Sequence, residues 1–147
     1  MRARGWVLGL LLSASPAWST PERCDFALDL VWKARSWKHL HDAWRKYPDC
    51  DDGVVADSYS EFVVHTLATH WETLWEANWL MERDPAFRAF VLGHIDATTD
   101  VDELSRILAN AKLVVPRGTA SLCREIASRA KRARSETQAV KKASHRP

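Results

Sequence analysis

Glu72 and Glu76 have the residue type and spacing for acid–base chemistry, because side chains four residues apart share one face of a helix. Two carboxyl groups held in this way can act as the acid and the base in glycan cleavage. Carboxylates on an exposed helix face are far more often simply solvated, and no neighbouring residue marks either one as desolvated. The chain also has neither a glycine-rich phosphate loop nor a nucleophile elbow. We therefore expect no catalytic residues and a protein that is not an enzyme.

Metal coordination is the next chemistry to consider, since His65, His70 and Glu72 are metal-ligand types. His65 and His70 are five residues apart, which places them about 140° apart around one continuous helix, and the HExxH order is missing. They do not converge on one ion by themselves. His41 and His94 each sit within an apolar stripe, where we expect satisfied core histidines.

The acidic loop Asp49–Gly53 invites comparison with a calcium loop. With Gly53 at loop position 6, positions 1, 3 and 12 become Pro48, Cys50 and Tyr59, which removes most of the required oxygen ligands. We interpret the loop as a solvated turn whose acids favour the start of the following helix. The sequence therefore predicts no metal and no cofactor.

Tryptophan is the most unusual component of the chain beyond residue 19. Three of these tryptophans, Trp71, Trp75 and Trp79, form an i, i+4, i+8 row that turns by about 40° per step on a helix. Because Leu67 and Trp71 already belong to the inner face, we expect Trp75 and Trp79 at its edge, partly exposed. They either cover the seam with a neighbouring helix or form a docking patch for a protein or a glycan. The six tryptophans are Trp32, Trp37, Trp44, Trp71, Trp75 and Trp79.

Charge divides the 147 residues into three segments, although the whole chain is nearly neutral at +2. Residues 1–19 combine Arg2 and Arg4, a seven-residue apolar run and a small-residue site, which predicts a cleavable secretory signal peptide. Residues 20–128 carry 12 basic and 18 acidic residues, and residues 129–147 carry seven basic residues and one acid. We predict an acidic helical domain over 20–128 and a basic, disordered tail over 129–147, frayed from about Lys131.

Apolar residues recur at three and four positions almost throughout, which predicts an all-α bundle of five to six short amphipathic helices. The first is expected from about Pro21 to Arg35 and the second from Ser36 to Tyr47, as an antiparallel hairpin. The third and longest starts from a Ser58/Glu61 capping box and continues to about Trp79. The remaining starts are expected at Asp84-Pro85, at Thr99 and at Thr119.

The three cysteines allow three single pairings. A Cys24–Cys50 disulfide is geometrically reasonable, because the two ends of an antiparallel hairpin come together there, and it suits an oxidising compartment. A Cys50–Cys123 bridge and three free thiols stay open as alternatives. We expect Cys123 to be a buried structural thiol.

Two stretches stand out beyond periodicity: Cys50-Asp51-Asp52-Gly53 leading through the following helix to His70-Trp71, and Arg83-Asp84-Pro85-Ala86-Phe87 with His94-Ile95-Asp96 and Leu122-Cys123-Arg124. They resemble small exported, all-helical proteins of Gram-negative bacteria that have no assigned activity. The resemblance covers about residues 45–127 and implies a fold and a compartment, not an activity. Immunity proteins that plug a toxin's active site are one class of exported bacterial protein with a similar architecture.

The sequence thus predicts a periplasmic or secreted helical protein, a monomer or weak dimer, that binds a protein partner such as a basic toxin or enzyme. It would act as an immunity or inhibitor protein or as an adaptor. A cell-wall glycan-binding or glycan-cleaving protein is the alternative. The basic tail lacks aromatic residues, so we expect no nucleic-acid partner and only weak contact with an anionic envelope. The predicted partner-binding residues are Glu72, Trp75, Glu76, Trp79 and Glu82.

Overall fold

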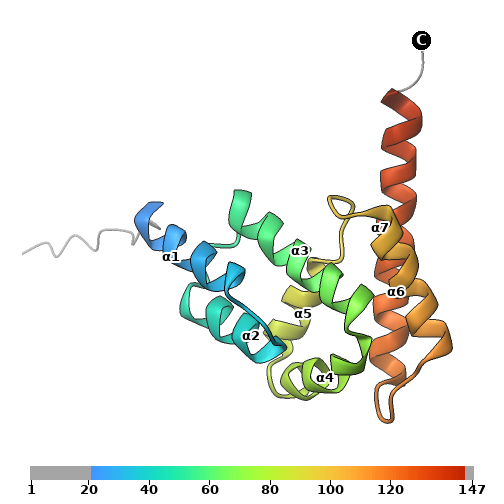
Figure 1. Ribbon diagram of the computed structural model, residues 1–147, viewed down its shortest axis with the longest axis horizontal. Helices are drawn as coiled ribbons and strands as arrows, with labels where there is room; N and C mark the ends of the chain where they lie inside the picture. Colours follow the sequence, from blue (N-terminus) through green and yellow to red (C-terminus); the bar gives the residue numbers. More distant parts are fainter. Residues whose placement is uncertain (1–20, 145–147) are drawn as a thin grey trace, which may run out of the picture.

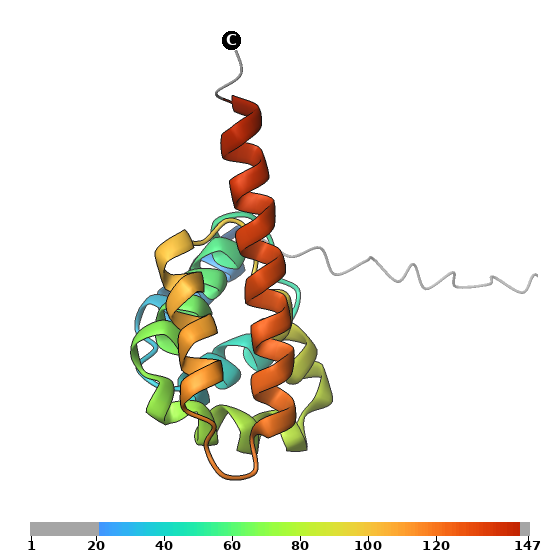
Figure 2. The same ribbon diagram turned by 90° about the vertical axis from the view of Figure 1, so that its right-hand side faces the viewer.

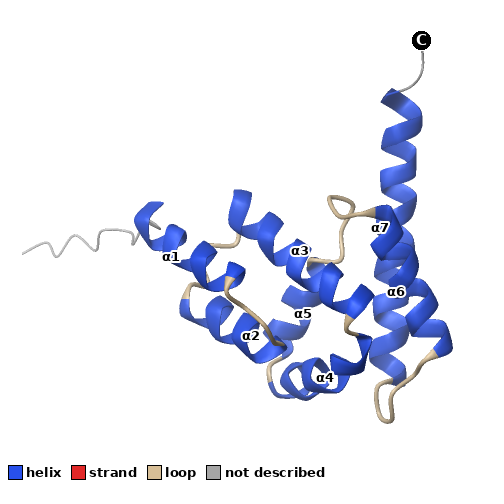
Figure 3. Cartoon of the chain, in the orientation of Figure 1, coloured by secondary structure: helices blue, strands red, loops and turns tan. Residues whose placement is uncertain are grey.

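Helices are the regular elements of residues 21–144, the part of the chain that the computed structural model describes (Figure 3). This confirms the all-α class. The predicted signal peptide lies outside the described residues. In chain order the elements are α1 (Pro21–Trp32), α2 (Trp37–Lys46), α3 (Gly53–Thr69), the 3₁₀ turn η1 (Trp71–Thr73), α4 (Leu74–Arg83), α5 (Pro85–Gly93), α6 (Val101–Leu113) and α7 (Ala120–Ser144).

The predicted third helix is in fact two helices, α3 and α4, separated at His70. The His70 N–H closes α3 by donating to the Thr66 carbonyl, and the Thr73 N–H and hydroxyl both donate to the His70 carbonyl. These bonds form the 3₁₀ turn η1 and redirect the chain into α4. The described residues therefore contain seven α-helices where five to six were predicted.

The start of α3 also differs from the prediction. The helix begins at Gly53, whose φ of 50° lies in the left-handed region that glycine tolerates best. Ser58 lies inside the helix and donates its hydroxyl to the Val54 carbonyl. The predicted Ser58/Glu61 capping box is therefore not the N-terminal cap.

Two predicted helix caps are confirmed. Ser36 Oγ accepts a hydrogen bond from the His39 N–H at 3.2 Å and caps α2. Asp84 Oδ1 accepts one from the Phe87 N–H at 3.1 Å, with Pro85 in the first turn of α5. Each cap satisfies an amide that the first helical turn leaves without a partner.

Two other caps differ from the prediction. Asp100, and not Thr99, caps α6 by accepting from the Asp102 N–H at 2.6 Å. Helix α7 does begin directly after Thr119, but the Thr119 hydroxyl donates to the Pro116 carbonyl at 2.8 Å, and no α7 amide among the described residues donates to it.

Helix α3 lies at the centre of the bundle and contacts α1 and α6 (Figure 1). Helices α1 and α2 pack together on one side, while α6 and α7 run antiparallel on the other, and α4 contacts both α2 and α5. The largest fully buried side chains come from six helices, and they include Trp37, Tyr59, Leu67, Leu74, Phe87, Ile107 and Ile126. One continuous apolar core therefore joins the two sides.

Helix α7 continues to Ser144, so the tail predicted to be frayed from about Lys131 is helical over its described length. Ala133 is buried at 2% exposure, and the Thr137 hydroxyl donates to the Ala97 carbonyl at 3.0 Å. Beyond these contacts the helix projects away from the rest of the fold (Figure 2). No helix among the described residues has both the length and the apolar character needed to cross a membrane.

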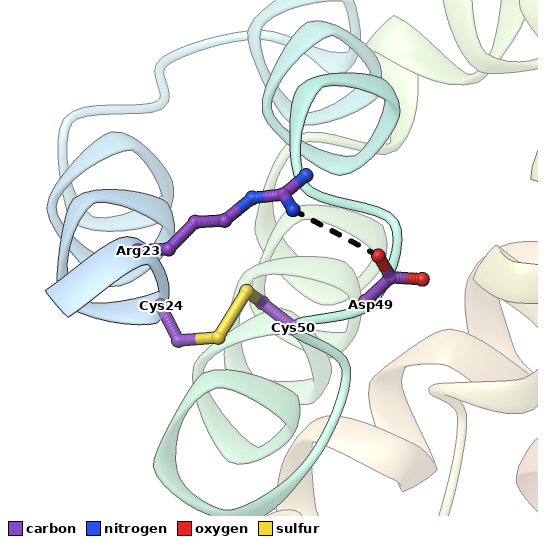
Figure 4. Close-up of a disulfide and its surroundings, with 4 residues drawn as sticks. All are labelled: Arg23, Cys24, Asp49 and Cys50. Atoms are coloured by element: carbon purple, nitrogen blue, oxygen red, sulfur yellow. Dashed lines mark ion pairs between the residues drawn. A yellow bond between two sulfur atoms is a disulfide. The ribbon is translucent and has the colours of Figure 1, made fainter. Parts of the chain in front are cut away.

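The predicted Cys24–Cys50 disulfide is present and joins the first turn of α1 to the segment after α2 (Figure 4). The two Cα atoms are 5.3 Å apart. Beside the bridge, Arg23 forms a long ion pair of 4.0 Å with Asp49. Cys123 is a free thiol and is buried, as expected.

Candidate functional site

The two tryptophans singled out by the sequence, Trp75 and Trp79, lie exposed on α4 beside a groove between α2 and α4. Trp75 is 65% exposed and Trp79 is 50% exposed, which agrees with the prediction that they are partly exposed. Together with Glu76 they line a cavity of about 480 Å³, here called the Trp75–Trp79 groove. Its lining residues are Lys38, His41, Asp42, Trp75, Glu76, Trp79 and Leu80.

The helical period of α4 explains why these rings face outward. Leu74, Ala77, Leu80 and Met81 form the buried side of the helix. Trp75 and Trp79 fall one turn apart on the opposite side. The groove thus presents aromatic surface from a rigid helix.

Trp71 does not continue the exposed row, because it belongs to η1 and is buried at 6% exposure. Its indole N–H donates to the Val114 carbonyl at 2.7 Å and so ties η1 to the segment after α6. The three tryptophans that look alike in sequence therefore divide into one core residue and two surface residues.

Glu76 has a structural contact at the edge of the groove. Its Oε1 accepts a hydrogen bond from the Lys38 N–H at 3.1 Å, in the first turn of α2. A carboxylate at a helix N-terminus interacts favourably with the helix dipole and with amides that lack helical partners. Glu76 thereby links α4 to the first turn of α2 at the edge of the groove.

Glu72 and Glu82 are exposed but are not part of the groove lining. Glu72 lies in η1, before α4 begins, and its Oε1 is 3.3 Å from His70 Nδ1. Glu82 accepts a hydrogen bond from the Asn78 amide at 2.9 Å. The structure thus brings three of the five predicted residues into one groove and places Glu72 and Glu82 outside its lining.

Arg83 adds a cation to the edge of the groove that the sequence analysis did not consider. Its guanidinium lies 4.0 Å from the centre of the Trp79 ring, and it donates a hydrogen bond to the Trp79 carbonyl. A cation at this distance is attracted by the ring quadrupole. Arg83 therefore holds the orientation of Trp79 before any partner binds.

Asp84 lies beside the groove and hydrogen-bonds residues of both α2 and α5. It accepts hydrogen bonds from His41 Nε2 at 3.0 Å and from Arg45 at 3.1 Å, in addition to the Phe87 amide. The His41 hydrogen bond, helped by the other two, lowers the pKa of Asp84 although burial opposes the shift. This carboxylate joins α2 to the start of α5 and positions His41 in the lining.

His65 and His70 lie closer together than helical spacing predicts, with ring centroids 6.4 Å apart. The reason is that α3 ends before His70, so the predicted separation of about 140° does not apply. Each Nδ1 faces a carboxylate, Glu103 for His65 and Glu72 for His70. Within residues 21–144, no three His, Cys, Asp or Glu side chains are placed to hold a metal ion.

His94 is buried, as predicted for a core histidine, and belongs to a polar cluster that the sequence did not reveal. Its Nδ1 is 2.9 Å from Ser60 Oγ and its Nε2 is 3.1 Å from Asp51 Oδ1. The Ser60 hydroxyl also lies 2.8 Å from Asp96 Oδ2. Ser60 is only 3% exposed, and with His94 and Asp51 it lines a separate cavity of about 390 Å³. The cluster therefore ties α3, α5 and the loop before α3 together.

Tyr59 lies beside this cluster with its hydroxyl buried and without a hydrogen-bond partner. Burial, with a smaller contribution from the charge of Asp51, raises the pKa of Tyr59 to about 12. The phenol therefore stays neutral at ordinary pH.

The α2 residues of the groove were not among the predicted site residues; they are Lys38, His41 and Asp42. The apolar stripe of α2 gave a partial signal for His41, which lies at the boundary between the buried and exposed sides of the helix, whereas Lys38 and Asp42 lie on the exposed side. The packing of α2 against α4 was the missing information.

The fold and the groove define a disulfide-containing, all-α domain with an exposed aromatic groove. Comparison of the chain with protein-family models, curated proteins and solved structures finds no match.

Proposed function

We propose that this chain is an exported, periplasmic helical protein that acts by binding another protein through the Trp75–Trp79 groove. The observation that carries the proposal is the pair of exposed indoles on α4 beside a cavity of about 480 Å³. Tryptophans are enriched among the residues that dominate binding energy, because each buries a large surface at a small cost in conformational entropy.

The charge around the groove suits a basic partner. The acids are Asp42 and Glu76 in the lining and Glu82 on the same side of α4 as the tryptophans. The local cations are Lys38, which is ion-paired with Asp42, and Arg83, so the acids exceed the cations by one. A segment that carries an aromatic or aliphatic side chain flanked by Lys or Arg fits this surface. Such a complex shows an association rate that falls as the salt concentration rises.

An oxidising compartment is supported by two independent features. Residues 1–19 have the basic, apolar and small-residue regions of a signal peptide, and the Cys24–Cys50 disulfide is of the kind that persists outside the cytoplasm. An inhibitor or immunity protein, or an adaptor, is the role we propose within that compartment.

The test is affinity capture from periplasmic and secreted extracts under non-reducing conditions, followed by titration of the captured protein. We expect Trp75→Ala with Trp79→Ala to weaken binding by at least roughly thirtyfold, since a hot-spot residue contributes about 2 kcal/mol or more. Leu113→Ala is the matched control, because Leu113 is 77% exposed and is not part of the groove lining. It should bind as the wild type does.

Two results would contradict the proposal. One is a captured protein whose affinity is the same for the double variant and for the control. The other is the absence of a protein partner combined with retention on purified cell wall, which would favour the glycan-binding alternative. Far-UV circular dichroism of the double variant must match the wild type, and loss of helix would show that the tryptophans are needed for folding.

A further inference from the structure

Another cavity lies between α1, α2, α3 and the start of α4, and it adjoins the Trp75–Trp79 groove at Glu76. It has a volume of about 560 Å³, within the range of about 300–1,000 Å³ that is typical of small-molecule sites. We call it the Trp32 cavity, after the exposed indole in its wall. Only Glu76 lines both this cavity and the Trp75–Trp79 groove.

Trp32 gives the cavity an aromatic wall that is both open to solvent and fixed. The side chain is 62% exposed, although it ends a helix whose other face is in the core. Its indole N–H donates to Ser58 Oγ at 3.2 Å, and the Ser58 hydroxyl donates to the Val54 carbonyl at 2.8 Å. The hydrogen bond to Ser58 links the Trp32 ring on α1 to α3, so the side chain loses little conformational freedom when a ligand packs on it.

The floor of the cavity is apolar. Trp37 and Phe62 meet edge to face, with centroids 5.9 Å apart, and Val31 lies beside them. The Trp37 indole N–H already donates to Thr73 Oγ1 at 2.9 Å. The floor thus offers aromatic and aliphatic surface with no unused donor from Trp37.

Polar groups of both kinds surround the mouth. Glu61 lines the cavity, and within residues 21–144 no hydrogen bond or ion pair involves its carboxylate. His65 and His70 also line it, and because each uses Nδ1 toward a carboxylate, each has Nε2 left for a ligand. A carboxylate accepts hydrogen bonds, and an imidazole nitrogen accepts or donates according to its tautomer.

The charge of the lining does not favour a strongly charged ligand. Arg35 is the one Lys or Arg in the lining, and one nitrogen of its guanidinium is held by the carbonyls of Trp32 and Ala34. Glu61 and Glu76 are the acids, and Glu76 is engaged with the Lys38 N–H. An anionic ligand would face two carboxylates, and a cation would face Arg35.

We propose that the Trp32 cavity binds a short neutral saccharide, with one sugar ring packed on the Trp32 indole and hydroxyl groups paired with Glu61, His65 and His70. A sugar ring has a C–H face that packs on the electron-rich face of an indole and a rim of hydroxyls that donate and accept hydrogen bonds. A fixed exposed indole, an apolar floor and a mixed polar mouth match both sides of that ligand. This site adjoins the proposed protein-binding groove at Glu76, but it has its own exposed indole, Trp32, and the proposal does not depend on the groove.

The experiment uses the disulfide-bonded protein and three neutral probes: tri-N-acetylchitotriose, cellotriose and maltotriose. Two-dimensional ¹H–¹⁵N NMR resolves the indole N–H signals individually. We expect at least one probe to shift the Trp32 signal and the amides of Phe62 and His65 in a saturable way. Trp32→Ala should weaken this binding by at least roughly tenfold, and Glu61→Gln should weaken it without changing the fold.

Trp75→Ala is the matched control, because Trp75 is as exposed as Trp32 but does not line the Trp32 cavity. It should bind the probe as the wild type does, which separates this proposal from the protein-binding one. The proposal is overturned if no probe gives a saturable shift up to about 10 mM, above the millimolar affinities expected of weak ligands. It is equally overturned if the shifts centre on Trp75 and Trp79, or if Trp32→Ala and Glu61→Gln both bind with wild-type affinity. Glu61 is exposed and keeps the test decisive even if the Trp32 variant does not fold.

Discussion

Reduction of the Cys24–Cys50 disulfide should cost the domain a large share of its stability. The bridge closes a loop with a sequence separation of 26 residues. In the chain-entropy description, opening a loop of this length releases unfolded-state entropy worth about 3.5 kcal/mol at 25 °C. Typical domains are stable by about 5–15 kcal/mol, so the reduced protein should be marginal but still able to fold.

The same loss can be expressed as a melting temperature. Unfolding of the described domain, residues 21–144, carries an entropy of about 0.26 kcal/mol/K at about 2.1 cal/mol/K per residue. Dividing the free-energy loss by this entropy gives a fall of about 13 °C in the melting temperature. The Trp75–Trp79 groove should survive reduction at low temperature, because it is built from α2 and α4 and contains neither cysteine of the disulfide.

The assay is urea unfolding, followed by circular dichroism, of the oxidised and reduced protein. Cys123→Ala, which keeps the bridge, should lose the same free energy on reduction as the wild type does. Cys24→Ala with Cys50→Ala should be insensitive to reductant. A difference below about 1 kcal/mol between oxidised and reduced wild type would refute the reasoning, since it would mean that the bridge does not constrain the unfolded chain.

Two further predictions concern buried or partly buried titratable groups. Because the folded-state pKa of Asp84 is lowered, chiefly by its hydrogen bond with His41, its stabilisation is present above the unfolded pKa near 3.8 and is lost as pH falls through the folded value. Asp84→Asn retains the helix cap and should destabilise the domain by roughly 1 kcal/mol at pH 7. It should also reduce the loss of stability on acidification, as measured by urea unfolding at pH 7 and pH 3. An unchanged acid sensitivity would contradict the role given to Asp84. Tyr59→Phe should be neutral or stabilising by up to about 1 kcal/mol, because the removed hydroxyl is buried without a partner. The same variant should lose the tyrosine ionisation near pH 12 in an ultraviolet titration, and a destabilisation of about 2 kcal/mol or more would show that the hydroxyl does have a partner.

Local sequence signals were sufficient where the physics is local. Helical periodicity identified the all-α class, and the caps at Ser36 and Asp84 follow from side chains that bond amides three residues ahead. The Cys24–Cys50 pair followed from the closeness of the ends of a helical hairpin. Each of these depends on neighbours in the chain and on one simple packing step.

The break at His70 was not predictable from periodicity, because Leu67, Trp71 and Leu74 keep a helical spacing straight through it. The turn is made by Thr73, which bonds the His70 carbonyl, and by Trp71, which reaches the Val114 carbonyl 43 residues later. The first contact is local but competes with a good helical pattern, and the second is tertiary. This break also brought His65 and His70 together.

The helical course of α7 was missed for a different reason. Beyond Ile126 the helix packs with small residues, of which Ala130 and Ala133 are buried, so a search for large apolar residues ended too early. Ala, Lys, Arg, Gln and Glu dominate this stretch and have high intrinsic helix propensity. That signal was present in the sequence and was outweighed by the loss of hydrophobic periodicity.

For the candidate sites, too, one part could be predicted from local spacing and another part could not. Exposure of Trp75 and Trp79 followed from their angular position relative to Leu74 and the core. The contribution of His41 depends on how α2 packs on α4, and the Trp32 cavity depends on three helices at once. No spacing along one helix contains that information.

The polar cluster around His94 has a consequence that follows from counting hydrogens. The Ser60 hydroxyl has one hydrogen, which it can give to Asp96 or to His94 Nδ1 but not to both. If Asp96 receives it, Nδ1 must donate to Ser60, and Nε2 needs its own hydrogen to bond Asp51. With Asp51 and Asp96 both ionised, the imidazolium form therefore satisfies all three interactions, whereas a neutral ring satisfies two at most. The number of bonds that fasten α5 to α3 and to the loop after the disulfide is thus set by a single proton.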